Sequence, residues 1–288
     1  MSRRVAERTG QGDGPHERPR VRELRDTEEI LRYLEQDRAY AAAALGYLEP
    51  NLFAHSRWLV AQGKTVGLCL FGGGPSGGLV FTMGDPEAVA AILDAERGPL
   101  QAYVICKPEH LPTVQERYAL WDRQDLMRMA VTPATFQPVA GAAVRLGAND
   151  VEALNRLYRG ESGATFAAYH LRQGVYCGIW EDRRLVAVAG TQMISWTYGT
   201  AIVANVLTHP HYRGQGYATA VTGAVTATLL EHCREVVLNV DPSNTPAVRA
   251  YTRLGYRDAG RLSEAWGLRK QGGFWSPLVR WLERLFRR

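Results

Sequence analysis

The sequence predicts a mixed α/β protein, of the α+β type, that consists of two domains. Its 288 residues suit about two domains of ordinary size. Short apolar runs bounded by turn residues alternate with segments of helical periodicity, and this mixture occurs in both halves of the chain. A hydrophobic content of 46% and a charged content of 22% are typical of globular proteins, which excludes a wholly disordered or fibrous chain.

The first half follows an N-terminal segment, 1–22, that lacks hydrophobic periodicity and is expected to be a disordered tail. Asp26 is expected to cap the first helix, with Glu29 at capping-box distance. The other elements are predicted from apolar runs, turn residues and helical spacing. Strands are expected at 58–61, 65–71, 79–82, 102–106 and 126–131, and helices at 86–95 and 112–118.

The second half follows a polar, proline-bearing linker, 132–142. Asp150 is expected to cap its first helix, Pro246 suits the first turn of its last helix, and Gly255 suits the residue just beyond that helix. Strands are expected at 143–146, 175–180, 185–194, 201–207 and 236–240, with a helix at 217–232. The predicted domains are 23–131 and 143–265, followed by a basic tail, 266–288.

One short alignment indicates an internal duplication. Lys107–Val114 (KPEHLPTV) parallels Asp241–Val248 (DPSNTPAV), with two prolines and a valine matching at one constant offset. Each segment follows an apolar strand. Three matches between common residue types leave duplication and chance equally open.

The charge distribution argues against nucleic acid as a partner. The net charge is +5, and residues 269–288 alone carry six basic side chains and one acidic one, so the rest of the chain is balanced. No apolar run reaches the ~18–20 residues of a membrane span, and the N-terminus lacks a secretory apolar core. We therefore expect a cytoplasmic protein. Its cysteines are widely spaced and predict reduced thiols and no metal site: Cys69, Cys106, Cys177 and Cys233.

The C-terminal tail is expected to form a basic amphipathic helix after Pro277. Leu278, Trp281 and Leu282 are among the residues on its apolar face. Such a helix suits either contact with an anionic membrane surface or packing on its own domain or on a partner subunit. An oligomer is one of the outcomes that this pattern leaves open.

The most informative stretch is VLTHPHYRGQGYAT, residues 206–219. A strand is expected to end at Thr208, and a loop with Gly214 and Gly216 precedes a helix that begins near Tyr217. Backbone N–H groups of such a loop, together with a helix N-terminus, make a cradle for phosphate. No Gly-Lys-Ser/Thr follows, which excludes a Walker loop, and a dinucleotide fingerprint would need glycine at Thr219.

Two segments together resemble the GNAT N-acetyltransferase superfamily. RGQGYA, from Arg213, resembles its pyrophosphate loop R/Q-x-x-G-x-G/A. NTPAVRAYTRLGY, from Asn244 to Tyr256, resembles its element N-x-x-A-x-x-x-Y-x-x-x-G-F, with only the last aromatic changed. The resemblance covers about residues 143–262 and implies two GNAT-like domains, each a mostly antiparallel sheet flanked by helices.

The resemblance also implies a cosubstrate, acetyl-coenzyme A, and roles for particular residues. The strand end is expected to pair with the pantetheine arm, the loop to enclose the pyrophosphate, and Asn244 to contact the coenzyme. Tyr251 matches the tyrosine that protonates the leaving thiolate; by itself it also suits a core position beside Ala247 and Leu254. The coenzyme-binding residues so implied are Val206, Leu207, Thr208, Arg213, Gly214, Gln215, Gly216, Tyr217, Ala218, Thr219 and Asn244.

The general base is the missing part of this pattern. Relatives that acetylate ribosomal-protein alanines carry a glutamate where this chain has Asn239, which cannot accept a proton. Glu161, His170 and Glu181 are nearby alternatives, and each also suits a solvated or structural position. No base is assigned.

The first half, 23–131, lacks both coenzyme elements. Its glycine cluster, 71–78, lies between strands and predicts a hairpin loop rather than a phosphate cradle. Tyr118 is one position out of register with Tyr251. This half therefore resembles the degenerate domain of a tandem acetyltransferase.

The sequence as a whole favours an N-acetyltransferase that moves acetyl, or a short acyl group, to an amine of a small molecule or peptide. Asn239 keeps a second hypothesis open, a non-catalytic acyl-CoA sensor or regulatory module. The acceptor is not identified, because the orientation of Trp180, Trp196 and Tyr198, which are candidate pocket residues, does not follow from sequence.

Overall fold

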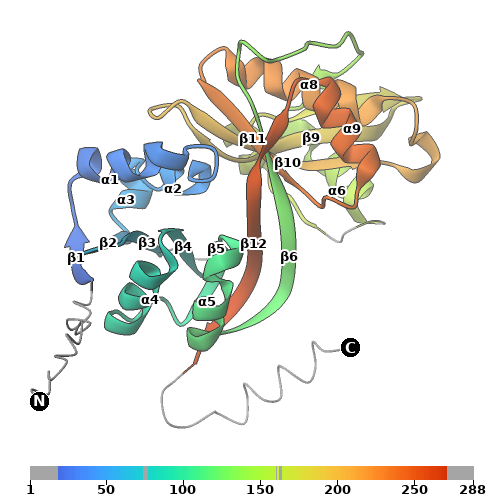
Figure 1. The fold of residues 1–288 in the computed structure, drawn as a ribbon. Helices are drawn as coiled ribbons and strands as arrows, with labels where there is room; N and C mark the ends of the chain where they lie inside the picture. The colour runs from blue at the N-terminus through green and yellow to red at the C-terminus, as the bar shows by residue number, and fades with distance from the viewer. Residues whose placement is uncertain (1–18, 74–76, 160, 162–163, 271–288) are drawn as a thin grey trace, which may run out of the picture.

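The computed structural model describes residues 19–73, 77–159, 161 and 164–270, and these form one twelve-stranded sheet with helices on both faces (Figure 1). The strand order is β1-β2-β3-β4-β5-β12-β6-β11-β10-β9-β8-β7. The strands are β1 (Arg20–Leu24), β2 (Ser56–Gln62), β3 (Val66–Gly72), β4 (Gly78–Gly84), β5 (Gln101–Cys106), β6 (Tyr118–Val131), β7 (Val144–Arg145), β8 (Cys177–Glu181), β9 (Arg184–Ser195), β10 (Thr200–Thr208), β11 (Glu235–Val240) and β12 (Arg257–Arg269).

Each half of the sheet is covered by two groups of helices. In the first half, α1 and α2 bury one face and α4 and α5 the other; in the second half, α8 and α9 share one core, and α6 and α7 pack in another. The α-helices are α1 (Thr27–Leu34), α2 (Ala42–Gly46), α3 (Pro50–Phe53), α4 (Pro86–Ala95), α5 (Leu111–Arg117), α6 (Val151–Arg159), α7 (Ala168–Gln173), α8 (Tyr217–Leu230) and α9 (Thr245–Arg253). One-turn 3₁₀ helices are η1 (Glu35–Asp37), η2 (Pro108–His110), η3 (Ala148–Asp150) and η4 (Pro210–Tyr212).

Local signals set the helix ends closely. Pro86 lies in the first turn of α4, which has the predicted bounds, because proline lacks the N–H that a first turn leaves unused. Asp26 caps α1 as predicted by accepting a hydrogen bond from the Glu28 N–H. The expected capping box does not form, since the Glu29 carboxylate bonds Arg22 of β1 instead.

The two halves exchange strands, which the sequence did not predict. Strand β12, from the end of the described chain, lies between β5 and β6 and is antiparallel to both. Strand β6, from the first half, pairs with β11 of the second half over Met127–Val131. In Figure 1, β6 and β12 run side by side from one half of the molecule to the other. The two predicted domains therefore share one continuous sheet.

The strand exchange corrects several expected boundaries. Strand β6 begins at Tyr118 rather than at 126, because its first part pairs with β12. Residues 20–22 lie in β1 and residues 266–269 in β12, so these parts of the expected tails are strands. Residues 1–18 and 271–288, which include the expected C-terminal amphipathic helix, lie outside the described residues.

The halves repeat one topology, which supports the duplication that the short alignment left open. The parallel pair β4–β5 in the first half corresponds to the parallel pair β10–β11 in the second. In both halves a proline-led turn leaves the inner strand and enters a helix, α5 or α9, whose first turn contains Pro112 or Pro246. All four cysteines are free and buried, as predicted.

Contacts on the α2–α3 side fix one half against the other. Ala42 of α2 packs in a small core with Ile202 and Val237 of the second half. The Glu49 carboxylate accepts hydrogen bonds from the hydroxyls of Ser195 (2.6 Å) and Thr197 (3.0 Å). These contacts hold the first half over the second-half sheet, on the side of β9 and β10.

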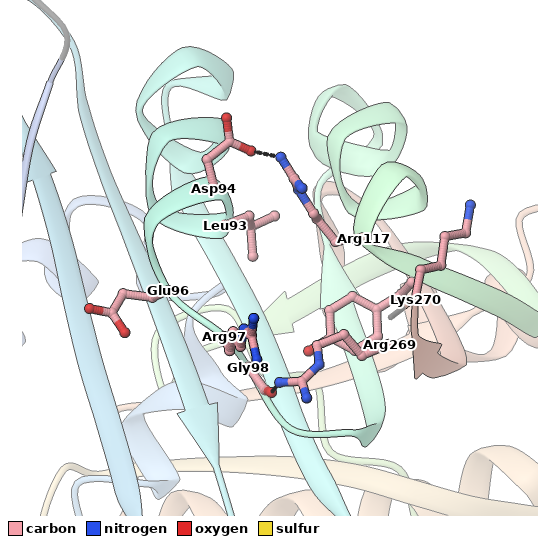
Figure 2. Close-up of a pocket in the computed structure, with 9 residues that line it drawn as sticks. Leu93, Asp94, Glu96, Arg97, Gly98, Arg117, Arg269 and Lys270 are labelled. Atoms are coloured by element: carbon pink, nitrogen blue, oxygen red, sulfur yellow. Dashed lines mark hydrogen bonds and ion pairs between the residues drawn. The ribbon is translucent and has the colours of Figure 1, made fainter. Parts of the chain in front are cut away.

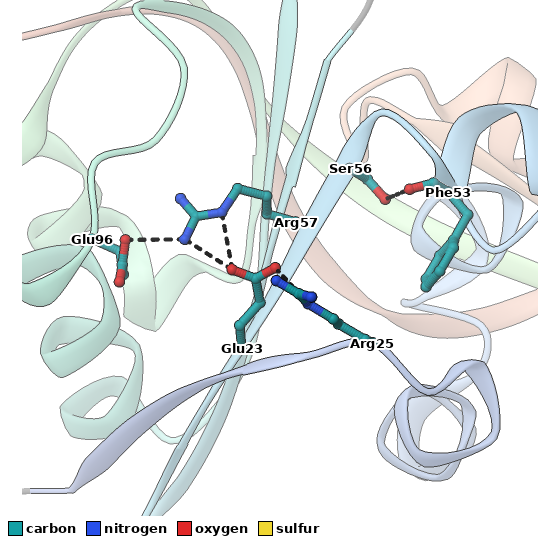
Figure 3. Close-up of polar contacts among 6 residues, drawn as sticks. All are labelled: Glu23, Arg25, Phe53, Ser56, Arg57 and Glu96. Carbon is teal, nitrogen blue, oxygen red and sulfur yellow. Dashed lines mark hydrogen bonds and ion pairs between the residues drawn. The ribbon is translucent and has the colours of Figure 1, made fainter.

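The outer edge of the first half is held by surface ion pairs (Figure 3). Arg57 of β2 lies between Glu23 of β1 and Glu96 after α4, at 3.2 Å from each carboxylate. These side chains are partly exposed, so each pair contributes about 0–1 kcal/mol. The pairs orient the edge strand, and the cores supply most of the stability.

Candidate active site

The site begins with a bulge in β10. Strand β10 pairs with β11 from Thr200 to Val203 only, and its register with β9 shifts between Ala204 and Leu207. Asn205 lies in the bulge with a φ of +55°, and its carbonyl accepts a hydrogen bond of 2.6 Å from the Tyr158 hydroxyl. The bulge turns the end of β10 away from β11, so the main chain of 206–208 faces an opening instead of a neighbouring strand.

The loop of residues 213–216, the candidate phosphate cradle, leads into the N-terminus of α8. Gly214 and Gly216 have φ values of +79° and +82°, which favour glycine. A Cβ placed on either glycine would meet no protein atom within 4 Å, so the space beside them is open. Gly216 is the N-cap of α8 and provides no side-chain cap, which leaves the N–H groups of the first turn available to an anion.

These parts meet in one cavity of about 690 Å³. Its wall combines the end of β10, the glycine loop, the start of α8 and one side of α9. Gln215, also predicted to bind coenzyme, lies in the loop but does not line the cavity. The predicted residues that line it are Val206, Leu207, Thr208, Arg213, Gly214, Gly216, Tyr217, Ala218, Thr219, Asn244 and Tyr251.

Tyr251 reaches the cavity from α9 while most of its ring is in the core. The side chain is 7% exposed, and burial raises the pKa of its hydroxyl to about 12. The phenol is therefore protonated at neutral pH and able to donate. Asn244 is the N-cap of α9, and its side-chain oxygen accepts from the Ala247 N–H at 3.3 Å.

The three candidate bases do not line this cavity. Glu161 accepts a hydrogen bond of 2.8 Å from Arg213 in the glycine loop, and Glu181 accepts one of 2.6 Å from the Tyr217 hydroxyl. The His170 ring is at the start of α7, where its Nδ1 accepts from the Ala167 N–H. The two glutamates therefore support the cradle, and the histidine caps a helix.

Asn239 has a carboxylate partner that the sequence did not reveal. Its side-chain NH₂ donates to Glu264 of β12 at 2.8 Å, and the Tyr103 hydroxyl donates to the other oxygen of Glu264 at 2.8 Å. Glu264 is 8% exposed. The carboxylate at this position thus comes from the exchanged strand, far away in the sequence.

The structure adds cavity residues that the sequence did not predict, two arginines among them, and removes three candidates. Arg249 and Arg253, one turn apart on α9, line the cavity; their i, i+4 spacing is the signal that would have found them. Trp180 lines a separate cavity beside α6. Trp196 and Tyr198 lie in the β9–β10 turn, at the end of β10 opposite the cradle.

In the first half, a histidine side chain lies at the end of β4, the strand that corresponds to β10. His110 is fully buried beyond the end of β5, and the constant offset of the alignment matches it to Asn244. Its Nδ1 accepts from the Thr82 hydroxyl and its Nε2 donates to the Gly84 carbonyl, both at 2.9 Å. The side chain thus bonds the end of β4, where the second half has open main chain.

Figure 2 shows a different cavity, of about 550 Å³, at the far end of β12. Arg117 forms an ion pair with Asp94 there, and Arg269 donates to the Gly98 carbonyl. This cavity shares no lining residue with the cavity beside the glycine loop. Its basic side chains hold α4, α5 and β12 together.

Two further observations apply to the residues that the structure describes. Among them, no group of three or more His, Cys, Asp or Glu side chains is placed to hold a metal ion. None of their helices has the length and apolar character that crossing a membrane requires.

Comparisons with known proteins agree with this geometry. Residues 150–256 match the model of the acetyltransferase (GNAT) family. A GCN5-related N-acetyltransferase from Kribbella flavida is 21% identical, with a TM-score of 0.54 over 82% of this chain and 96% of its own. A tandem GNAT protein from the clavulanic acid biosynthesis pathway is 12% identical, with a TM-score of 0.50 over 88% of this chain and 100% of its own.

A Drosophila protein of 13% identity has a TM-score of 0.60 over 87% of this chain and 98% of its own. Among curated proteins none matches this chain significantly. Residues 150–256 thus match the GNAT acetyltransferase family, and the chain as a whole shares its fold with solved GNAT proteins, one of them a tandem GNAT protein.

Proposed function

We propose that this protein is an acetyl-CoA-dependent N-acetyltransferase that acts on an amine of a small molecule or peptide. The observation that carries the proposal is the single cavity that joins the splayed end of β10, the glycine loop, Asn244 and Tyr251. The exposed main chain, the anion cradle and the phenol suit the pantetheine arm, the pyrophosphate and the thiolate of one coenzyme molecule.

Different residues of the chain are proposed to act at different points of the acetyl transfer. Bound acetyl-coenzyme A would supply an activated thioester, at which the amine nitrogen forms a C–N bond as the C–S bond breaks. The main chain of 206–208 orients the arm and offers N–H donors to the carbonyl oxygen. Loop residues 213–219 hold the pyrophosphate, with Arg249 and Arg253 on the opposite wall. Tyr251 gives its proton to the thiolate and regains one from solvent.

The proton of the amine is assigned to water. Glu161, Glu181 and His170 are engaged in other hydrogen bonds and do not line the cavity. Asn239 is held by Glu264 through its NH₂ group, and an amide does not accept a proton at neutral pH. This supports an acceptor whose amine is neutral at the working pH.

Calorimetric titration with acetyl-coenzyme A, with ATP as the control nucleotide, tests the cavity. Saturable binding of acetyl-coenzyme A and not of ATP is expected, because ATP lacks the arm that pairs with the strand end. Thiol release is then measured with a panel of amines and peptides. Equal binding of both nucleotides would contradict the assignment of the cavity.

Asn239 favours a second candidate, an acyl-CoA sensor without turnover, because it stands where some relatives carry a base. The two functions differ in thiol release across the amine panel. Binding of acetyl-coenzyme A with no thiol release for any amine would favour the sensor.

A further inference from the structure

One buried arginine has no hydrogen-bond partner among the described residues. Arg128 lies in β6 opposite Asn239 of β11 and is 0% exposed. Its Nε and both terminal nitrogens lack acceptors in the described part of the chain. Glu264, Glu235 and Asp37 are near enough to attract the guanidinium electrostatically, but none accepts a hydrogen bond from it. Burial lowers its pKa, yet an arginine stays charged in a protein, so five N–H donors are left unused.

Arg128 lies at the bottom of a cavity of about 360 Å³. The cavity lies where β12 bulges: the register with β6 shifts between Asp258 and Arg261, and Gly260 has a φ of +118°. It shares no lining residue with the coenzyme cavity. The lining residues are Asp37, Tyr40, Lys107, Pro108, Glu109, Arg128, Ala259, Gly260 and Arg261.

The other cations of this cavity already have partners. Lys107 forms an ion pair with Asp37 at 2.8 Å and lies 5.0 Å from the centre of the Tyr40 ring. Arg261 forms an ion pair with Asp258 at 2.7 Å. The unused donors of Arg128 therefore call for an acceptor with two oxygens, such as a carboxylate. Asp37 and Glu109 are acids on the same wall, which disfavour a dianion and suit an ammonium group.

We propose that this cavity binds a small zwitterion of the α-amino acid class, with its carboxylate on Arg128 and its ammonium group toward Asp37 and Glu109. The site joins η1, the turn after β5 and both exchanged strands, so its ligand contacts the elements that unite the halves. It is separate from the coenzyme cavity and does not depend on the proposed transferase activity.

Thermal unfolding and calorimetry of the full chain with each standard L-α-amino acid test the proposal. Acetate, ethylamine and inorganic phosphate serve as partial probes. At least one amino acid is expected to raise the Tm saturably and to bind roughly tenfold or more tightly than any partial probe, since both charges are recognised together. Binding of phosphate alone, or of no amino acid, would overturn the proposal.

Two variants locate the binding, and one controls for charge. Arg128→Met removes the donors; it is expected to raise the Tm of the ligand-free protein, because an unpaired buried charge is lost, and to weaken amino acid binding roughly 10- to 100-fold. Ala259→Trp fills the cavity and leaves Arg128 in place, so it is also expected to abolish binding. Arg123→Met removes an exposed arginine of the same strand, paired with Asp125, and binding should be unchanged.

Amino acid binding that survives both Arg128→Met and Ala259→Trp would place the ligand elsewhere and refute the site. A lower Tm for Arg128→Met together with an unchanged ligand response would make Arg128 structural. If Arg128→Met does not fold, Ala259→Trp alone tests the site: loss of amino acid binding supports it, and unchanged binding refutes it.

Discussion

Two tyrosines near the end of the GNAT motif show how position determines the role of a side chain. Their ring centres lie 6.2 Å apart, and burial raises the pKa of both hydroxyls. Tyr256 is bonded to the Thr226 hydroxyl at 2.8 Å inside the core, whereas Tyr251 lines the coenzyme cavity. The sequence motif includes both positions, and the structure places Tyr251 at the cavity and Tyr256 in the core.

Tyr251→Phe is expected to reduce kcat by roughly 100-fold or more, because the thiolate then leaves without a general acid. The Kd for acetyl-coenzyme A should stay nearly unchanged, since the hydroxyl is proposed to act on the thiolate. Steady-state thiol release and calorimetry measure the two quantities. Tyr256→Phe is the matched control: it loses a buried hydrogen bond and should lower the Tm with little change in kcat. Equal losses of kcat in both variants would contradict the acid role.

Gly216→Ala tests the cradle. A non-glycine residue at a φ of +82° costs about 1–2 kcal/mol, and the added methyl group would occupy the open space beside the loop. Coenzyme affinity is expected to fall by roughly tenfold or more, as measured by calorimetry. Gly199→Ala carries a similar backbone cost, at a φ of +60° in the turn at the other end of β10, and should leave the affinity unchanged. A parallel loss in both variants would indicate a general stability effect.

At the scale of elements, the buried His110 side chain at the end of β4, here called the His110 plug, makes the stability of the first half sensitive to acid. Burial lowers the pKa of His110 in the folded protein below its ordinary value of 6.5. The unfolded chain therefore binds the proton more readily, and stability falls as the pH drops below about 6.5 toward the folded-state pKa. Above about pH 6.5 the stabilising contribution of neutral His110 is fully present.

Unfolding of the full chain followed from pH 7.5 to 5 measures this effect. The wild type is expected to lose more stability across that range than His110→Gln, which has no titrating group at the plug but a lower stability throughout. Subtracting the variant removes other titrations, including that of Glu235, whose raised pKa acts in the opposite direction. If stability falls equally with pH in the wild type and in His110→Gln, His110 is not the titrating group.

Element-level prediction succeeded where the signal was local. Pro86 and Asp26 mark helix starts through their own backbone chemistry, and the loop from Arg213 is recognisable as a motif. Strand β12 escaped prediction because its apolar alternation is interrupted by the Asp258–Arg261 bulge. The His110 plug escaped as well, because its partners Thr82 and Gly84 are remote in sequence.

At the scale of the whole molecule, the shared strands make each half dependent on the other. A segment of residues 132–288 lacks β6, so β11 and β12 lose the strand that lies between them. We expect this segment alone to misfold or aggregate and to bind no acetyl-coenzyme A, as judged by circular dichroism and calorimetry. Co-expression with residues 1–131 should restore binding. An isolated segment that binds coenzyme normally would contradict this dependence.

A single cooperative unfolding transition is expected for the full chain in scanning calorimetry. Trp58→Ala removes one of the largest side chains of the first-half core. The variant is expected to lose about 3–5 kcal/mol of stability, which should lower this single Tm. Coenzyme binding should be lost in the same transition. Two resolved transitions, with only the first one shifted, would indicate independent halves.

Which strand pairs with which was beyond the reach of sequence reasoning. The apolar runs of β6 and β11 fit a conventional two-domain arrangement as well as the observed one, because burial alone does not identify a partner strand. The same exchange brings Glu264 of β12 to Asn239 and joins Arg128 of the first half with residues 259–261 of the second half in one cavity. The functional surroundings of the site therefore depend on topology that no local pattern encodes.

The position of β12 also has a consequence for synthesis of the chain on the ribosome. The sheet of the first half needs a strand that ends at Arg269, so its gap between β5 and β6 stays open until that strand has left the exit tunnel. One edge of β5 and both edges of β6 would lack their partner strands while more than a hundred further residues are translated. Folding of this protein is then expected to be a late event in translation, completed for both halves at once.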